Sequence, residues 1–283
     1  MFARTRVRSS MANGVRRSET FIAQLDYSQP MAPFITHAQL RVGDLERSLG
    51  FYRDLLGFTV HSDAGGSVGL APEGAASETL TLREVRGLKH RPRHPRTAGL
   101  YHVAWLVPSR PDLGRALDGL RRAFYPLTGA SDHAVSESLY LDDPDGNGVE
   151  IYADKPRDTW KWSNGRVHMT VDPLDLEGLL HDAHGASASA KASADKPAHV
   201  LTAGTVIGHV HFVVPNLDEA KRYWNTDVGL DITLEWPMLV GLSHGGYHHH
   251  VNLNNWAGEG APADDPGVAG LDSVTMGGKT LKP

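Results

Sequence analysis

Hydrophobic and polar positions alternate along three segments of the chain, and a histidine lies near the start of each. Such an alternation with a period of two predicts a β-strand with one apolar face. In the second segment the apolar face would carry Val103, Trp105 and Val107, and the other face would carry His102, Ala104 and Leu106. After the first strand, apolar residues follow at helical spacing (Leu45, Leu49, Tyr52 and Leu56) and Gly57 ends the predicted helix.

The same unit is repeated along the chain. The segment that starts at Ile35 aligns without gaps with the segment that starts at Ile207, so that His37 matches His209, and a third copy starts at Leu100. Further short strands follow each helix, and the second unit ends in a predicted hairpin, with strands at about 138–142 and 148–153 around a DPDGNG turn. The repeat is therefore βαβββ, and a fourth copy starts at VAGLDSVTM but ends before a helix.

These repeats predict an α+β fold of paired βαβββ modules with a truncated fourth module. Residues 1–33 are expected to lie outside the fold. A disordered tail, or a start codon placed upstream of Met11 or Met31, is favoured over the alternative, a transit-like segment. Modules one and two are expected to form one domain, 34–160, and module three with the truncated module four a second, 206–283. Between them, 161–205 would connect the two and include an Ala/Ser-rich flexible linker at about 184–196.

Composition removes several classes of function. The 28 Lys and Arg against 33 Asp and Glu give a net charge of -5, which argues against nucleic-acid binding. We expect no membrane association and a cytoplasmic location, because no apolar run is long enough for a membrane span. The absence of Cys excludes thiolate sites, so that any metal among the 16 His would be held by imidazole and carboxylate. The basic stretch 89–96 is expected to be a solvated loop.

Because side chains alternate between the two faces of a strand, the predicted strands place four polar side chains on the same face. His102, Tyr140, Glu150 and His209 all alternate with apolar neighbours that would pack against the helices, so they project from the opposite face. If two such curved sheets pair into a cup, these residues line its inside. Two imidazoles and one carboxylate form the ligand set of an open-sided non-haem Fe(II) site.

The run from His133 to Glu150 resembles the signature of type I extradiol ring-cleaving dioxygenases of the vicinal oxygen chelate (glyoxalase) superfamily. The matching positions are His133, Leu139-Tyr140, Asp143-Pro144, Gly146 and Glu150. The sequence departs from this pattern at Ser131, where the family usually has Gly, Asn, Thr or an aliphatic residue. The repeated modules resemble the same superfamily over most of the chain.

The resemblance implies roles for individual residues. His102 and Glu150 would be metal ligands, and the third ligand would be His209, with His37 as the alternative. An acid/base histidine would come from module three. Register with the family pattern favours His249, whereas strand parity favours His248 or His250.

The resemblance also implies a reaction. His133 and Tyr140 would hydrogen-bond the catecholate. The cofactor would be Fe(2+), with Mn(2+) as the alternative, and a catechol and O2 would give a hydroxymuconic semialdehyde-type product. Family members are generally homo-oligomers. Two other activities use the same modules: a glyoxalase-like metal-dependent lyase or isomerase, and a metal-free small-molecule binding protein of the resistance type.

Overall fold

The computed structural model describes residues 34–92, 96–187 and 200–282. The predicted N-terminal extension, 1–33, lies outside these residues, and so does most of the predicted linker. The first part of that linker is helical, because α3 (Leu176–Ser187) continues past the point at which the Ala/Ser-rich composition begins. The predicted start of the linker at residue 184 is therefore wrong. The division of the chain into domains stays a prediction.

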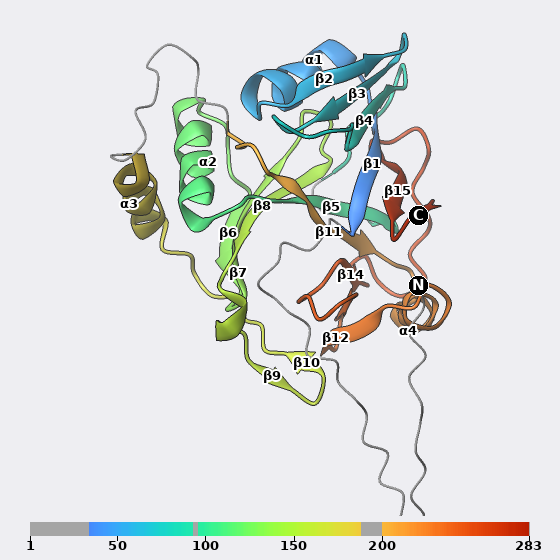
Figure 1. Ribbon diagram of the computed structural model, residues 1–283. Coiled ribbons are helices and arrows are strands. Elements are labelled where there is room, and N and C mark those ends of the chain that lie inside the picture. Colours follow the sequence, from blue (N-terminus) through green and yellow to red (C-terminus); the bar gives the residue numbers. More distant parts are fainter. Residues whose placement is uncertain (1–33, 93–95, 188–199, 283) are drawn as a thin grey trace, which may run out of the picture. The chain divides into compact units, whose positions relative to one another are not determined.

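Three complete modules and the start of a fourth follow one another along the chain (Figure 1). Module one comprises β1 (Ile35–Val42), α1 (Leu45–Leu49), the π-helical η1 (Gly50–Leu55), β2 (Thr59–Asp63), β3 (Ser67–Ala71) and β4 (Leu80–Glu84). Module two comprises β5 (Gly99–Leu106), α2 (Arg110–Arg122), β6 (Gly129–Asp132), β7 (Ser136–Asp142) and β8 (Gly148–Asp154). Module three comprises β11 (Val206–Val213), α4 (Leu217–Arg222), the π-helical η3 (Tyr223–Asp227), β12 (Asp231–Trp236), β13 (Leu239–Ser243) and β14 (Val251–Asn254).

Shorter elements complete the chain. Between modules two and three lie η2 (Arg157–Thr159), β9 (Trp162–Ser163), β10 (Arg166–Val167) and α3. The truncated fourth module consists of β15 (Gly270–Met276) and β16 (Lys279–Leu281). The α+β class, the repeated βαβββ modules and the truncated fourth copy are thus confirmed.

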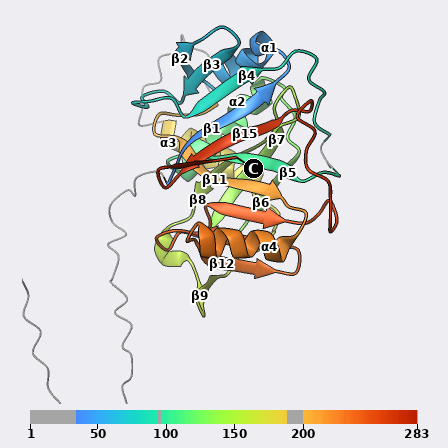
Figure 2. The same cartoon turned by 90° about the vertical axis from the view of Figure 1, so that its right-hand side faces the viewer.

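Modules two and three share one sheet of eight strands in the order β12-β13-β14-β11-β5-β8-β7-β6. Their first strands, β5 and β11, are antiparallel neighbours at its centre. The expected pairing of the two modules is therefore realised edge to edge, through β5 and β11, within a single sheet. Module one forms a second sheet, in which β1 pairs with β15 of the truncated module (Figure 2).

Local sequence explains how each module begins and ends its helix. Asp44, Ser109 and Asn216 cap α1, α2 and α4, because each side chain accepts a hydrogen bond from the backbone NH three residues later. The predicted first helix is divided into α1 and η1. Gly57 and Gly229 follow the helical segments at φ values of 92° and 90°, a left-handed conformation that favours glycine.

The helix-facing side of the eight-stranded sheet forms the core. Val103 and Trp105 are buried there as predicted, and Trp105 meets Phe58 of module one edge-on at 4.8 Å. The basic stretch 89–96 is not simply a solvated loop. Arg91 is only 2% exposed and pairs with Asp264, so that this part of the prediction is wrong. Among the described residues, no helix is long and apolar enough to span a membrane.

Candidate metal centre

Three neighbouring strands, β8, β5 and β11, position the predicted ligands. In the register of the sheet, Ala104 of β5 lies between Glu150 of β8 and His209 of β11. Since the methyl group of Ala104 is small, the two longer side chains can meet above it. His102, two positions earlier on β5, projects from the same face and completes the group.

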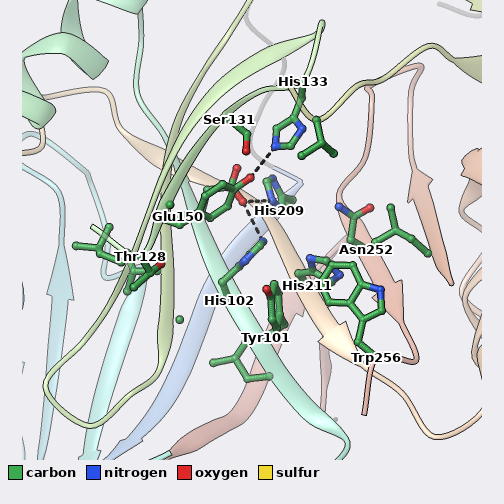
Figure 3. Close-up of a pocket in the computed structure, with 18 of the residues that line it drawn as sticks. Tyr101, His102, Thr128, Ser131, His133, Glu150, His209, His211, Asn252 and Trp256 are labelled. Atoms are coloured by element: carbon green, nitrogen blue, oxygen red, sulfur yellow. Dashed lines mark hydrogen bonds and ion pairs between the residues drawn. The ribbon is translucent and has the colours of Figure 1, made fainter. Parts of the chain in front are cut away.

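The side chains of His102, Glu150 and His209 point toward one another (Figure 3). Glu150 Oε2 lies 2.9 Å from His102 Nε2 and 3.0 Å from His209 Nε2. One nitrogen or oxygen of each residue lies within 4.8 Å of the others, and all three residues are buried. Two imidazoles and a carboxylate held in this way could ligate a divalent metal.

The hydrogen bonding of one candidate ligand atom supports this fit. Among the described residues, His102 Nε2 is buried without a hydrogen-bond partner, although Glu150 Oε2 is within reach. A buried polar atom without a partner is costly, and a cation between these atoms would satisfy it. The donor set therefore fits a metal ion.

Protonation also suits metal binding. Burial alone would raise the pKa of Glu150, but His209 and His102 together hold it well below the usual range. Burial lowers the pKa of His209 to about 4, despite the opposing effect of Glu150. At neutral pH the carboxylate is therefore ionised and the His209 imidazole is neutral, which are the forms that donate electron pairs to a metal.

Two β-bulges interrupt the seam between β5 and β11, and one of them brings an extra residue to this face. The register shifts between Ile207 and His209, and again where Tyr101 is the additional residue on β5. Tyr101 and His102 consequently both line the cavity, although adjacent strand residues normally face opposite sides. Strict alternation along the sequence places Tyr101 on the face opposite to His102, so the sequence alone does not assign Tyr101 to the cavity.

The predicted pair His133 and Tyr140 lies at the rim of the same centre. Tyr140 on β7 is directly opposite Glu150 on β8. His133 Nδ1 donates to the carbonyl oxygen of Thr170 at 2.7 Å, so the Nε2 of a neutral His133 accepts from the Tyr140 hydroxyl, also at 2.7 Å. The phenol oxygen keeps a lone pair for a further donor.

The three consecutive histidines, His248, His249 and His250, contact different parts of the structure. His249 lines the cavity, and its ring centroid lies 4.3 Å from that of His209. His248 faces Asp154, and His250 bonds to Ser243. Strand parity does not apply to these residues, because β14 starts only at Val251.

The alternative third ligand, His37, belongs to the other sheet. It lies on β1, where its Nε2 is 2.8 Å from Thr81 Oγ1. The structure therefore brings together the trio with His209 and leaves His37 on a separate module.

The centre opens into a cavity of about 340 Å³. The lining also includes Tyr101, His211, Asn252 and Trp256, which lie to the right of the trio and below it in Figure 3. His211 is held by Asn254, whose side-chain nitrogen lies 2.9 Å from its Nε2. His211 lies two positions after His209 on β11, whereas no sequence pattern marks Trp256, which follows the last strand of module three.

Comparisons with known proteins agree with this architecture. Residues 34–151 match the Glyoxalase/Bleomycin resistance protein/Dioxygenase superfamily. The chain is 41% identical over 245 residues to a catechol-2,3-dioxygenase of Bacillus subtilis (strain 168), covering 86% of this chain and 81% of that protein. It is 34% identical over 98 residues to biphenyl-2,3-diol 1,2-dioxygenase 2 of Rhodococcus globerulus, covering 31% of this chain and 52% of that protein.

A solved structure shares the fold. The crystal structure of a putative dioxygenase from Bacillus subtilis subsp. subtilis str. 168 superimposes with a TM-score of 0.54 at 15% identity, over 86% of this chain and 69% of the other. With the family match and the extended similarity to a catechol-2,3-dioxygenase, the chain belongs to the Glyoxalase/Bleomycin resistance protein/Dioxygenase superfamily, among its extradiol dioxygenases.

Proposed function

We propose that this protein is an Fe(2+)-dependent extradiol dioxygenase that cleaves catechol or a substituted catechol with O2. The observation that carries the proposal is the buried trio of His102, Glu150 and His209 at the floor of a cavity of about 340 Å³. The name of the Bacillus subtilis relative, catechol-2,3-dioxygenase, supports the substrate class. The product would be of the hydroxymuconic semialdehyde type.

The three ligand residues approach from the sheet and leave the cavity side open. A bound ferrous ion would supply positive charge that favours ionisation of the diol, and free positions for the diol and dioxygen. Mn(2+) is the alternative ion that the same ligand set accepts. The chain itself has to orient the two reactants and keep water away.

Two groups in the cavity can handle protons. Tyr140, held by His133, presents an oxygen that can accept a hydrogen bond from a substrate hydroxyl. His249 is the proposed acid and base, because its Nε2 is buried and has no hydrogen-bond partner among the described residues. Burial and the nearby His209 lower its pKa well below the ordinary value, so the imidazole is neutral and able to take a proton.

The remaining walls suit a flat aromatic ring. Tyr101 packs edge-on against His211 at 4.8 Å and against Trp256 at 5.2 Å. Met169 and Leu239 add apolar surface elsewhere in the lining. Such walls bind an aromatic face and exclude water from the reacting atoms.

Anaerobic loading with ferrous ion, followed by catechol and oxygen, tests the proposal. We expect oxygen uptake together with a yellow ring-opened product. Metal binding without oxygen uptake would instead indicate a lyase or isomerase, and failure to bind metal would indicate a binding protein. His209→Gln should abolish iron binding, whereas the matched variant His37→Gln should retain it.

Two further expectations accompany this proposal. A cytoplasmic location and assembly into homo-oligomers are typical of such enzymes, and both stay predictions for this chain. Fractionation and size-exclusion chromatography with light scattering would test them.

A further inference from the structure

A chain of hydrogen bonds extends from His249 away from the cavity. His249 Nδ1 lies 2.8 Å from His248 Nδ1, and His248 Nε2 lies 2.9 Å from Asp154 Oδ1. His248 is completely buried and His249 nearly so. This chain of hydrogen bonds therefore connects His249 in the cavity, through the imidazole of His248, to the carboxylate of Asp154 at the end of β8.

Two tyrosines hold the carboxylate end of this chain. The Tyr247 hydroxyl donates to Asp154 Oδ1 at 3.0 Å, and the Tyr152 hydroxyl lies 2.7 Å from the Tyr247 hydroxyl. Since the Tyr247 proton is directed to Asp154, Tyr152 is the donor in the second contact. Every bond at this end therefore points toward the carboxylate.

The carboxylate sets the direction of the remaining bonds. Asp154 Oδ1 accepts from Tyr247 and acts as acceptor for His248 as well, so a neutral His248 carries its proton on Nε2 and its Nδ1 is an acceptor. His249 must then donate from Nδ1 to His248. The result is that His249 Nε2 carries a lone pair, and this is the atom that has no hydrogen-bond partner within the described part of the chain.

We propose that Asp154 and His248 are positioning residues that hold His249 as its Nδ1-protonated tautomer, with the Nε2 lone pair facing the cavity. The use of that lone pair in catalysis rests on the proposed function, whereas the tautomer itself does not. In the opposite tautomer, Nε2 would bear a proton and a neutral His249 could not accept one from the substrate.

The expected preference is large enough to measure. A hydrogen bond to a charged group is typically worth about 10- to 100-fold in equilibrium, and the wrong tautomer would forfeit the bond from His248 to Asp154. The ratio of the Nδ1-protonated to the Nε2-protonated tautomer of His249 should fall to near unity when the Asp154 carboxylate is replaced by an amide, because an amide can donate as well as accept.

The direct test is nitrogen-15 NMR of the metal-free protein labelled at histidine. The His249 signals are identified by their loss in His249→Gln, and long-range proton–nitrogen correlations report which ring nitrogen is protonated. We expect Nδ1 protonation in the wild-type protein. Asp154→Asn and His248→Phe should each shift His249 toward the Nε2-protonated form or a mixture.

Asp158→Asn is the matched control. Asp158 is exposed and only four residues from Asp154, so this substitution makes the same change in charge outside the hydrogen-bonded chain. It should leave the His249 tautomer unchanged. Nε2 protonation of His249 in the wild-type protein would overturn the proposal without any variant, and so would an unchanged tautomer in both Asp154→Asn and His248→Phe.

Activity provides a second measurement that separates this inference from the proposed function. In the iron-loaded protein, Asp154→Asn should lower kcat about 10- to 100-fold with iron content and KM little changed, and Asp158→Asn should remain within twofold of the wild type. If the wild-type protein shows no dioxygenase activity, the proposed function fails, while the NMR result still decides the tautomer.

Discussion

Gly208 lies at the β-bulge in β11, where Tyr152 of β8 approaches the backbone closely. A Cβ atom added at Gly208 would lie 1.8 Å from Tyr152 Oη, 2.6 Å from its Cζ and 2.9 Å from its Cε1. The backbone of Gly208 does not adopt the left-handed conformation. The substitution Gly208→Ala therefore tests steric contact without adding backbone strain.

Tyr152 has little room to move away from the added methyl group. Its side chain is wholly buried, its ring lies 4.9 Å from the His209 ring, and its hydroxyl bonds to Tyr247. Overpacking a buried site costs about 1–3 kcal/mol, and loss of the hydroxyl contact adds roughly 1 kcal/mol. We expect Gly208→Ala to lower the free energy of unfolding by about 3 kcal/mol and the Tm by roughly 6–12 °C.

Urea denaturation followed by tryptophan fluorescence measures the effect, and thermal unfolding provides the Tm. Gly50→Ala is the control, since a Cβ there would meet no described atom within 4 Å. In a Tyr152→Phe background Gly208→Ala should cost about 1 kcal/mol less, because only the contact with Oη is removed. If Gly208→Ala matches the stability of Gly50→Ala, the close approach of Tyr152 is refuted.

Three further predictions concern metal, pH and a buried ion pair. Under anaerobic conditions, ferrous ion at 100 times its Kd should raise the free energy of unfolding by about 2.7 kcal/mol, and Glu150→Gln should remove this gain in a thermal shift assay. Burial raises the pKa of Asp143 to about 6, so its protonated form stabilises the fold below pH 4, and this stabilisation is lost as pH rises through 6. Relative to Asp143→Asn, the wild-type protein should therefore lose about 2–3 kcal/mol of stability between pH 4 and pH 7 in urea titrations, and a constant difference would contradict the shift. Arg91→Met should lower stability by about 3–5 kcal/mol because it leaves the Asp264 carboxylate, which is only 13% exposed, without its cation, and Asp264→Asn in the same chain should restore part of the loss, as judged by Tm.

Much of the centre could be predicted from sequence because the strands that carry it are regular around the key residues. The apolar neighbours Val103 and Trp105 fix the face of His102, and the short hairpin fixes Tyr140 opposite Glu150. Internal repetition then located the equivalent histidine of module three. These inferences depend only on local periodicity, which the folded sheet preserves.

The remainder depends on irregular backbone and on distant contacts. Tyr101 reaches the cavity because of a bulge, and the histidines before β14 lie outside a regular strand, so that parity cannot orient them. Arg91 is buried in an ion pair with Asp264, a residue that is distant in the sequence. The edge-to-edge joining of modules two and three likewise results from long-range strand pairing, which periodicity does not encode.

The central position of β5 and β11 has a consequence for how the protein is made. During synthesis β5 and β8 emerge well before β11, so a growing chain first presents His102 and Glu150 beside an unpaired strand edge. Exposed edges of this kind invite pairing with other chains, and closing a long loop to reach the correct partner slows folding. Arrival of β11 therefore shields that edge and brings His209 next to His102 and Glu150, so the candidate metal centre exists only once the two modules have paired.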